Sequence, residues 1–295
     1  MLRRTVLAIT LIASFALALP ATAQQGAPQM PTPTTSGYVP VTGGKVYYAT
    51  YGRGAPLVLL HGGLMTIEAF GPVLPKLAET REVITIEAQG HGRTGPLDRP
   101  MSFDSMAADV AAVIKSLGYD KVDVVGYSMG GTIGMRLALA HPELVNRLVI
   151  ASAPFAYSGW HDYNQQGMRS LNASLAESMK GSPLYEGFAA VNPDAEVNFP
   201  KLLDQMTYMG EDYDYSADIP KLTVPTQLIY GDWDAVRTSH VAKFFELLGG
   251  GLQDALWDGS GMNQNRLAIL PGVTHYTMMT EPMLAETALE FLDAK

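Results

Sequence analysis

The chain has 295 residues, of which 47% are hydrophobic, and its formal net charge is −9. This length is enough for one large core, as a single domain with an insertion or as two domains. A net-acidic chain without a basic run is a poor match for nucleic acid or for an anionic membrane surface, so neither is expected as a partner. The lack of cysteine excludes disulfides, thiol nucleophiles and cysteine-ligated metals.

Residues 1–23 have the pattern of a secretory signal peptide. The pair Arg3-Arg4 forms a basic start, Thr5–Leu19 is apolar, and Ala21-Thr22-Ala23 is a small-residue cleavage site. The apolar stretch is short for a membrane span, which favours cleavage over an uncleaved anchor. We therefore expect a bacterial periplasmic or secreted protein with no stable membrane anchor. Export by the general secretory route is favoured, and the twin-arginine route stays open.

Residues 24–36 are rich in Pro, Thr, Gln and Gly and predict a disordered linker before a folded domain at 37–295. In that domain, strand-like and helix-like segments alternate. The predicted strands are Tyr38–Val41, Lys45–Tyr51, Leu57–Leu60, Val83–Glu87, Val122–Val125, Leu148–Ala151, Thr226–Tyr230 and Arg266–Leu270. The predicted helices are Ile67–Glu79, Ser102–Leu117, Gly131–Ala140, Ser239–Leu248 and Pro282–Leu292.

This alternation predicts an α/β fold, with a mostly parallel central sheet of about eight strands and helices on both faces. The alternation stops at about residues 154–218, where helix-like pieces and turns occur without a clear strand. That segment predicts an inserted helical cap. The stretch 249–265 is longer and richer in glycine than a minimal connection needs, and the sequence assigns it no role.

The segment Gly126-Tyr127-Ser128-Met129-Gly130 is the most informative motif in the chain. It lies between a predicted strand and a predicted helix, which is the setting of a nucleophile elbow with serine at the apex of a tight turn. Glycine at both flanks suits a turn with little room for Cβ atoms. The motif therefore predicts Ser128 as a nucleophile and the Met129 amide as an oxyanion donor. Glycine and serine also fill ordinary turns, so the motif alone leaves a structural role open.

A serine nucleophile needs a base to take its proton and an acid to orient that base. Of the six histidines, His275 lies just after the last predicted strand, where active sites of open α/β sheets are found. Asp232 and Asp234 follow another strand, and either one is a candidate for the acid. Both give the chain order Ser, Asp, His.

A second oxyanion donor is expected from the loop after an earlier strand. His61-Gly62-Gly63-Leu64 follows Leu57–Leu60, and its glycines allow the backbone to come close to a substrate. The amide of Gly63 is the first choice and that of Leu64 the second. His61 and His91 lie at strand ends beside glycines, where they organise turns or contact the site.

Five segments in order resemble the α/β-hydrolase fold superfamily, in its soluble esterase-like branch with a helical cap. They are His61-Gly62-Gly63, Gln89-Gly90-His91-Gly92-Arg93-Thr94, Gly126-Tyr127-Ser128-Met129-Gly130-Gly131, Gly231-Asp232-Trp233-Asp234 and Pro271-Gly272-Val273-Thr274-His275. The resemblance covers residues 37–295 and implies the triad Ser128, Asp234 and His275. It prefers Asp234 to Asp232 because the family's acid usually lies three residues after this glycine. Glu87 and Gln89 depart from the Asp and Arg of many relatives, in a turn that is mainly structural.

Together these residues predict a serine hydrolase that cleaves carboxylic esters of small to medium, mostly apolar substrates through an acyl-enzyme, without metal or cofactor. Tyr127, Phe155, Trp160 and Tyr276 are the candidate pocket residues. Serine at the elbow argues against haloalkane dehalogenases and epoxide hydrolases of this fold, which carry Asp there. A lactonase, a C–C or C–N bond hydrolase, a perhydrolase or a non-catalytic ligand receptor stay open as alternatives, as does the oligomeric state.

Overall fold

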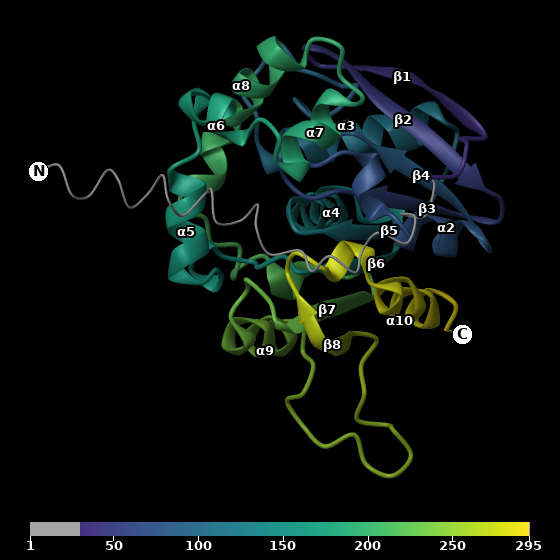
Figure 1. Ribbon diagram of the computed structural model, residues 1–295. Helices are drawn as coiled ribbons and strands as arrows, with labels where there is room; N and C mark the ends of the chain where they lie inside the picture. The colour runs from purple at the N-terminus through teal and green to yellow at the C-terminus, as the bar shows by residue number, and fades with distance from the viewer. Residues whose placement is uncertain (1–29, 295) are drawn as a thin grey trace, which may run out of the picture.

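The computed structural model describes residues 30–294, and its centre is one eight-stranded sheet (Figure 1). The strands lie in the order β1-β2-β4-β3-β5-β6-β7-β8. Strand β2 is antiparallel to β1 and β4, and every other neighbouring pair is parallel. The bounds are Thr35–Val41, Gly44–Gly52, Ala55–Leu60, Arg81–Ile86, Val122–Tyr127, Val145–Ala151, Thr226–Trp233 and Arg266–Thr274 for β1 to β8. The predicted fold class is confirmed.

Helices cover both faces of this sheet. Among the longer elements, the bounds are Val73–Ala78 for α2, Phe103–Ser116 for α3, Met129–Ala140 for α4, Thr238–Leu247 for α9 and Pro282–Leu292 for α10. Helices α2 and α10 pack together on one face, while α3 and α4 pack together on the other. No helix between residues 30 and 294 combines the length and apolar character needed to cross a membrane.

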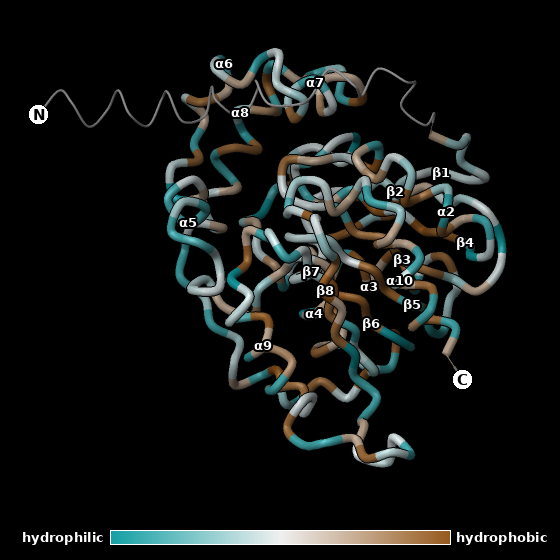
Figure 2. The backbone as a smooth tube through the Cα atoms, turned by 60° about the horizontal axis from the view of Figure 1, so that its bottom comes forward, coloured by the Kyte–Doolittle hydropathy of each residue, from teal (hydrophilic) through white to brown (hydrophobic). Residues whose placement is uncertain are grey.

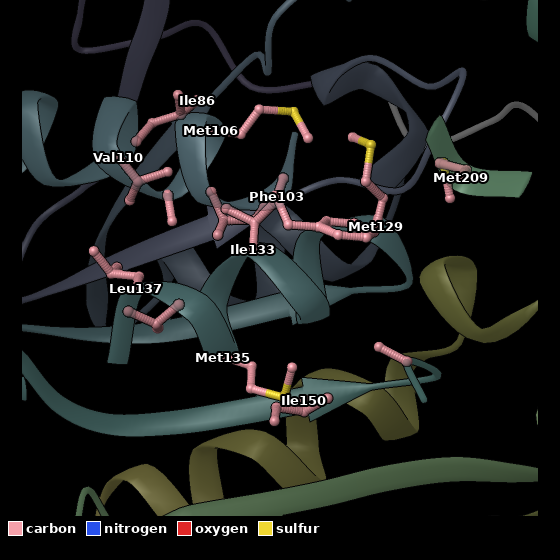
Figure 3. Close-up of a cluster of buried hydrophobic side chains, with 14 of the residues drawn as sticks. Ile86, Phe103, Met106, Val110, Met129, Ile133, Met135, Leu137, Ile150 and Met209 are labelled. Atoms are coloured by element: carbon pink, nitrogen blue, oxygen red, sulfur yellow. The ribbon is translucent and has the colours of Figure 1, made fainter. Parts of the chain in front are cut away.

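Alternation along the strands divides the core between the two faces. In β5, Val124 belongs to the cluster under α3 and α4, whereas Val125 and Tyr127 belong to the cluster under α2 and α10. Both faces are therefore apolar, as a parallel sheet covered by helices requires. Figure 2 shows the result as brown strands at the centre of the molecule. Figure 3 shows part of the α3–α4 cluster, which includes Ile86, Val110 and Ile133.

The segment between β6 and β7 forms the cap, which consists of short helices. They are α5 Asp162–Arg169, α6 Ala176–Met179, α7 Pro183–Ala189, α8 Ala195–Gln205 and the 3-10 turn η6 Met206–Gly210. Two isolated bridges hold the base of the cap, one between Ala156 and Asp214 and one between Trp160 and Val236. Apolar side chains of the cap, including Phe199 and Leu203, join the α3–α4 cluster, so cap and sheet share one core.

Several predicted boundaries differ from the structure. Ile67–Glu79 is not one helix, because Gly71 has φ 36° and Pro72 lacks an amide, so a 3-10 turn at Ile67–Phe70 precedes α2. Strand β1 begins at Thr35, inside the predicted linker 24–36, because Thr35 pairs with Thr50 of β2. Residues 24–29 and the predicted signal peptide at 1–23 lie outside the described residues.

The last strand is longer than predicted. Strand β8 continues through Pro271 to Thr274. Gly231 of β7 pairs with Leu270 and Trp233 with Thr274, so the extra residues 271–273 form a bulge in β8. The connection from α9 to β8, residues 249–265, projects from the body beyond β8 (Figure 1). We call these residues the arm.

Candidate active site

Ser128 occupies a strained turn between β5 and α4. Its φ of 53° and ψ of −118° lie in a region that L-residues rarely adopt, and Met129 begins α4 immediately after it. A Cβ on Gly126 would overlap the carbonyl of Gly130, and a Cβ on Gly130 would overlap that of Leu60. Both flanking glycines are therefore needed for this geometry, and the turn places Ser128 at the N-terminus of a helix.

The structure brings Asp234 and His275 together at the ends of β7 and β8. His275 Nδ1 lies 3.0 Å from Asp234 Oδ1, and both side chains are buried. A carboxylate only accepts hydrogen bonds, so Nδ1 donates and Nε2 of a neutral imidazole stays an acceptor. Strands β7 and β8 can approach because Gly231 has no side chain, since a Cβ there would overlap the Val273 carbonyl.

Several donors converge on the Asp234 carboxylate. Ser152 Oγ donates to Oδ2 at 2.5 Å, and the amides of Val236 and Gly231 donate at 3.1 Å and 3.3 Å. Burial raises the pKa of Asp234, but the hydrogen bonds from His275, Ser152 and Val236 outweigh it and hold the pKa below its ordinary value. Asp234 is therefore charged at neutral pH.

Sequence reasoning missed Ser152. It follows β6 directly, is completely buried, and has a positive φ of 54°. Its amide donates to the carbonyl of Ile229, which fixes the serine beside the end of β7. The one signal in the sequence was a serine at the end of a predicted buried strand, next to the strand that supplies the acid.

The other candidate acid, Asp232, has a structural position. Its side chain is exposed, and Oδ1 accepts a hydrogen bond from the amide of Gly272 at 2.8 Å. This contact ties the end of β7 to the glycine turn in β8. The geometry therefore favours Asp234 as the partner of His275.

Of the two candidate amides in the loop after β3, that of Leu64 is occupied. It donates to His91 Nε2 at 3.0 Å, while the amide of Ala88 donates to His61 Nε2 at 3.1 Å. Burial lowers the pKa of His61 to about 4 and that of His91 to about 3, so both rings are neutral acceptors. Because the Leu64 amide already donates to His91, the geometry favours the Gly63 amide as the oxyanion donor. The two histidines organise the turn.

A buried carboxylate supports the neighbouring turn. Glu87 Oε1 lies 2.7 Å from Arg93 Nη1, and its Oε2 accepts from the Arg93 amide at 2.5 Å. Burial nevertheless raises the pKa of Glu87 to about 7, against the effect of Arg93. Gly92 leaves the room that this carboxylate fills, because a Cβ there would overlap it.

The four predicted pocket residues have different positions. Trp160 is near the site, because its ring meets that of His275 edge-on at 5.3 Å. The Tyr276 ring also meets His275 edge-on, at 5.5 Å, and its hydroxyl accepts from Asn164 of α5 at 3.0 Å. Phe155 stacks on His240 with ring centroids 3.9 Å apart, which joins the base of the cap to α9. His240, near the start of α9, is thus partly buried.

Tyr127 lies beneath the site rather than in a pocket. It is completely buried, because strand alternation turns it toward the α2–α10 face. Its hydroxyl donates to the carbonyl of His275 at 2.6 Å, and the two rings are 5.3 Å apart. Tyr127 thus connects the elbow to the loop of His275 and places Ser128, the next residue, beside that loop.

Two methionines of the cap cover the loop after β3. A Cβ on Gly63 would come within 2.7 Å of Met206 Cε and 3.4 Å of Met209 Sδ. Figure 3 shows Met209 entering from the cap on the side where Met129 lies at the head of α4. The cap sequence contains many large apolar residues, and nothing in it distinguishes Met206 and Met209 from the others. Only the folded cap shows that they face Gly63.

Comparisons with known proteins agree with this geometry. The family model described as alpha/beta hydrolase fold matches residues 55–197. A solved structure of a serine hydrolase involved in carbazole degradation (CarC enzyme) superposes with a TM-score of 0.67 at 25% identity, over 88% of this chain and 99% of that one. The chain belongs to the α/β-hydrolase superfamily.

Curated relatives are hydrolases of more than one kind. The 2-hydroxy-6-oxo-6-(2'-aminophenyl)hexa-2,4-dienoic acid hydrolase of Metapseudomonas resinovorans is 27% identical over 277 residues, which are 88% of this chain and 91% of that protein. The soluble epoxide hydrolase of Corynebacterium sp. (strain C12) is 39% identical over 124 residues, which span only 42% of its length. These matches support a hydrolase as the class of enzyme.

Proposed function

We propose that this protein is a serine hydrolase that cleaves carboxylic esters of small to medium, mostly apolar substrates. The observation that carries the proposal is the buried Asp234–His275 pair, 3.0 Å apart, whose histidine loop is hydrogen-bonded to Tyr127, the residue before Ser128 at the head of α4. A charged acid, a base held in one tautomer and a serine on a strained turn are the parts that acyl transfer requires.

In the proposed reaction, His275 Nε2 takes the proton of Ser128 Oγ as that oxygen attacks the carbonyl carbon of the ester. The amides of Gly63 and Met129 donate to the oxyanion that forms. Collapse of this intermediate breaks the bond to the alkoxy oxygen, which leaves as an alcohol with the proton from His275. Water then attacks the acyl-enzyme by the same route and releases the acid and Ser128.

The side chains beside these groups support an apolar substrate. Met206 and Met209 cover Gly63, and the Trp160 ring lies against His275. Flexible thioethers and an aromatic ring suit an uncharged acyl chain of adaptable shape. The serine nucleophile also separates this chain from epoxide hydrolases of the same fold, which carry Asp at the elbow.

Steady-state hydrolysis of p-nitrophenyl acetate, butyrate and octanoate tests the proposal, with Ser128→Ala beside the wild type. We expect turnover of all three esters, a preference among chain lengths that reflects the cap methionines, and a loss of several orders of magnitude in the variant. A fluorophosphonate probe should label the wild type at Ser128 and leave the variant unlabelled. No turnover together with no labelling would refute serine chemistry.

A second candidate is hydrolysis of a carbon–carbon bond next to a ketone. It is favoured by the Metapseudomonas relative, whose match covers nearly all of both chains and whose named substrate is a keto acid without an ester bond. The same triad would serve. Labelling by fluorophosphonate without turnover of any of the three esters, together with cleavage of a 6-oxo-dienoic acid, would choose this candidate over the esterase.

A further inference from the structure

The arm exposes an unusual amount of apolar side chain. Trp257 is fully exposed, and Leu252, Leu256 and Met262 are between 59% and 67% exposed. All four lie within a single connection of 17 residues that projects beyond β8. Scattered apolar residues on a surface need no explanation, but four large ones together mark a surface that another molecule covers.

The arm has a defined shape without burying these side chains. The amide of Gly261 donates to the carbonyl of Ala255 at 3.1 Å, and Gln253 Nε2 donates to Gly261 at 3.2 Å. At its base, Asn263 and Asn265 both donate to the carbonyl of Leu248, at 3.0 Å and 2.7 Å. These bonds hold the arm in a turn whose apolar residues face outward.

The arm leads directly into an open edge of the sheet. Strand β8 is last in the strand order, and no strand in residues 30–294 pairs with its outer side. Ile269, in the middle of this edge, is 40% exposed. The edge offers free backbone groups from Arg266 to Leu270, and Pro271, which has no amide, ends the stretch that can pair.

We propose that two copies of this chain associate through β8, with the two edges antiparallel and each arm lying on the other copy. In such a pairing, residues before Arg266 of one copy lie beside residues after Leu270 of the other. Trp233 is located there, because it pairs with Thr274, and it is 77% exposed. The arm of one copy thus meets an exposed tryptophan of its partner, near the loop that carries His275.

The area fits a stable dimer. Burial of Trp257 removes about 200 Å² from water, and the three other apolar side chains of the arm add roughly 100 Å² each. Twofold symmetry makes each copy bury its own arm and the surface under its partner's arm. The four arm side chains contribute about 500 Å² per copy. With the surface under the partner's arm added, the buried area reaches the roughly 800 Å² per partner that standard interfaces bury.

Charge disfavours an anionic lipid surface as the occupant. The arm carries Asp254 and Asp258 and no Lys or Arg, so such a membrane would repel it. In a dimer these acids need no partner from the other copy, because they accept from the amides of Leu256 and Ser260 within the arm.

Sedimentation velocity of the purified protein across a range of concentrations tests the proposal. We expect a mass twice that of one chain, and Trp257→Asp should raise the dimer dissociation constant by at least about 30-fold, as at an interface hot spot. Val197→Asp adds the same charge at an exposed apolar position of α8 and should leave the dimer intact. A wild type that is monomeric at every concentration, or a Trp257 variant that dimerises like wild type, would overturn the proposal. So would a monomer that binds phosphatidylcholine vesicles through Trp257.

Cross-linking tests the edge itself. The chain has no cysteine, so Ile269→Cys introduces a single thiol near the predicted twofold axis. A short bismaleimide should join two such chains, and it should not join two chains of the matched variant Val197→Cys. Equal cross-linking of both variants, or of neither, would refute pairing through β8. Neither measurement depends on the reaction that the site catalyses.

Discussion

Replacing Ser152 with alanine removes one donor from the carboxylate that orients His275. The Ser152 hydroxyl and Asp234 Oδ2 are 2.5 Å apart, and both residues are buried. Water has little access to replace the lost bond, and alanine supplies no other donor. The variant therefore measures how much the hydrogen bond from Ser152, at the end of β6, stabilises the Asp234 carboxylate.

The size of the effect follows from this contact. A hydrogen bond to a charged group contributes about 1.5–3 kcal/mol. We therefore expect the free energy of unfolding of Ser152→Ala at pH 7 to fall by about 2 kcal/mol. A less firmly held Asp234 orients His275 less well, and we expect kcat for p-nitrophenyl butyrate to fall about tenfold, which corresponds to about 1.4 kcal/mol.

The pH dependence gives the sharper test. The folded-state pKa of Asp234 is below its ordinary value of 3.8, so the stability that it contributes is present above that value. This stability is lost as the pH falls through the folded-state pKa. The variant has a weaker depression of the pKa. The difference in unfolding free energy between wild type and variant should therefore be full at pH 7 and should shrink below about pH 4.

Urea unfolding at pH 7 and at pH 3, with kinetics at pH 7, measures these quantities. Ser178→Ala is the matched control, because Ser178 Oγ donates to the carbonyl of Leu175 at an exposed position. It should change the unfolding free energy by less than about 0.5 kcal/mol. If Ser152→Ala is as stable as this control at pH 7, or if its loss of stability is equal at both pH values, the reasoning is wrong.

Three further substitutions test other contacts. Tyr127→Phe removes the 2.6 Å bond to the His275 carbonyl. It should lower the unfolding free energy by about 1 kcal/mol and lower kcat with KM unchanged, and unchanged kinetics would contradict the role given to this hydroxyl. Gly231→Ala places a Cβ against the Val273 carbonyl. It should cost more than about 3 kcal/mol in urea unfolding, and a near-native variant would count against the close approach of β7 and β8. Burial raises the pKa of Glu87 from 4.5 to about 7, so its contribution to stability is present below pH 4.5 and is lost as the pH rises to 7. Glu87→Gln should flatten the dependence of stability on pH in this window, and an unchanged slope would mean that another group titrates there.

The order of strands and helices is readable from the sequence because each buried strand is a short apolar run between turn residues. Residues 154–218 contain no such apolar run, and this absence of predicted strands indicates the cap. The boundaries that differ depend on contacts between distant residues. Thr35 is extended because Thr50 is opposite to it, and β8 reaches Thr274 because that residue pairs with Trp233 of β7 after a bulge in β8. Local composition carries no signal for either.

The candidate site divides in the same way. Ser128 and His275 stand out because a glycine-flanked elbow and a loop after the last strand are local patterns. Ser152 has only a weak local signal, a serine at the end of a buried strand, because its role arises from the parallel register of β6 and β7, which aligns Ala151 with Ile229. For Tyr127, by contrast, the sequence contained a signal that the prediction of a pocket residue did not use. Period-two alternation in β5 turns it away from the face of Val124, so its burial could have been read from the sequence.

The strand order also predicts how activity is lost on warming. Ser128 follows β5, which has a strand on each side, whereas His275 follows β8, the outermost strand. An edge strand and its helix open more readily than the centre of a sheet. Partial opening of β8 and α10 would move His275 out of the site while Ser128 kept its position. We therefore expect inactivation to be a reversible local event that precedes global unfolding, and a second copy paired with β8 should delay it.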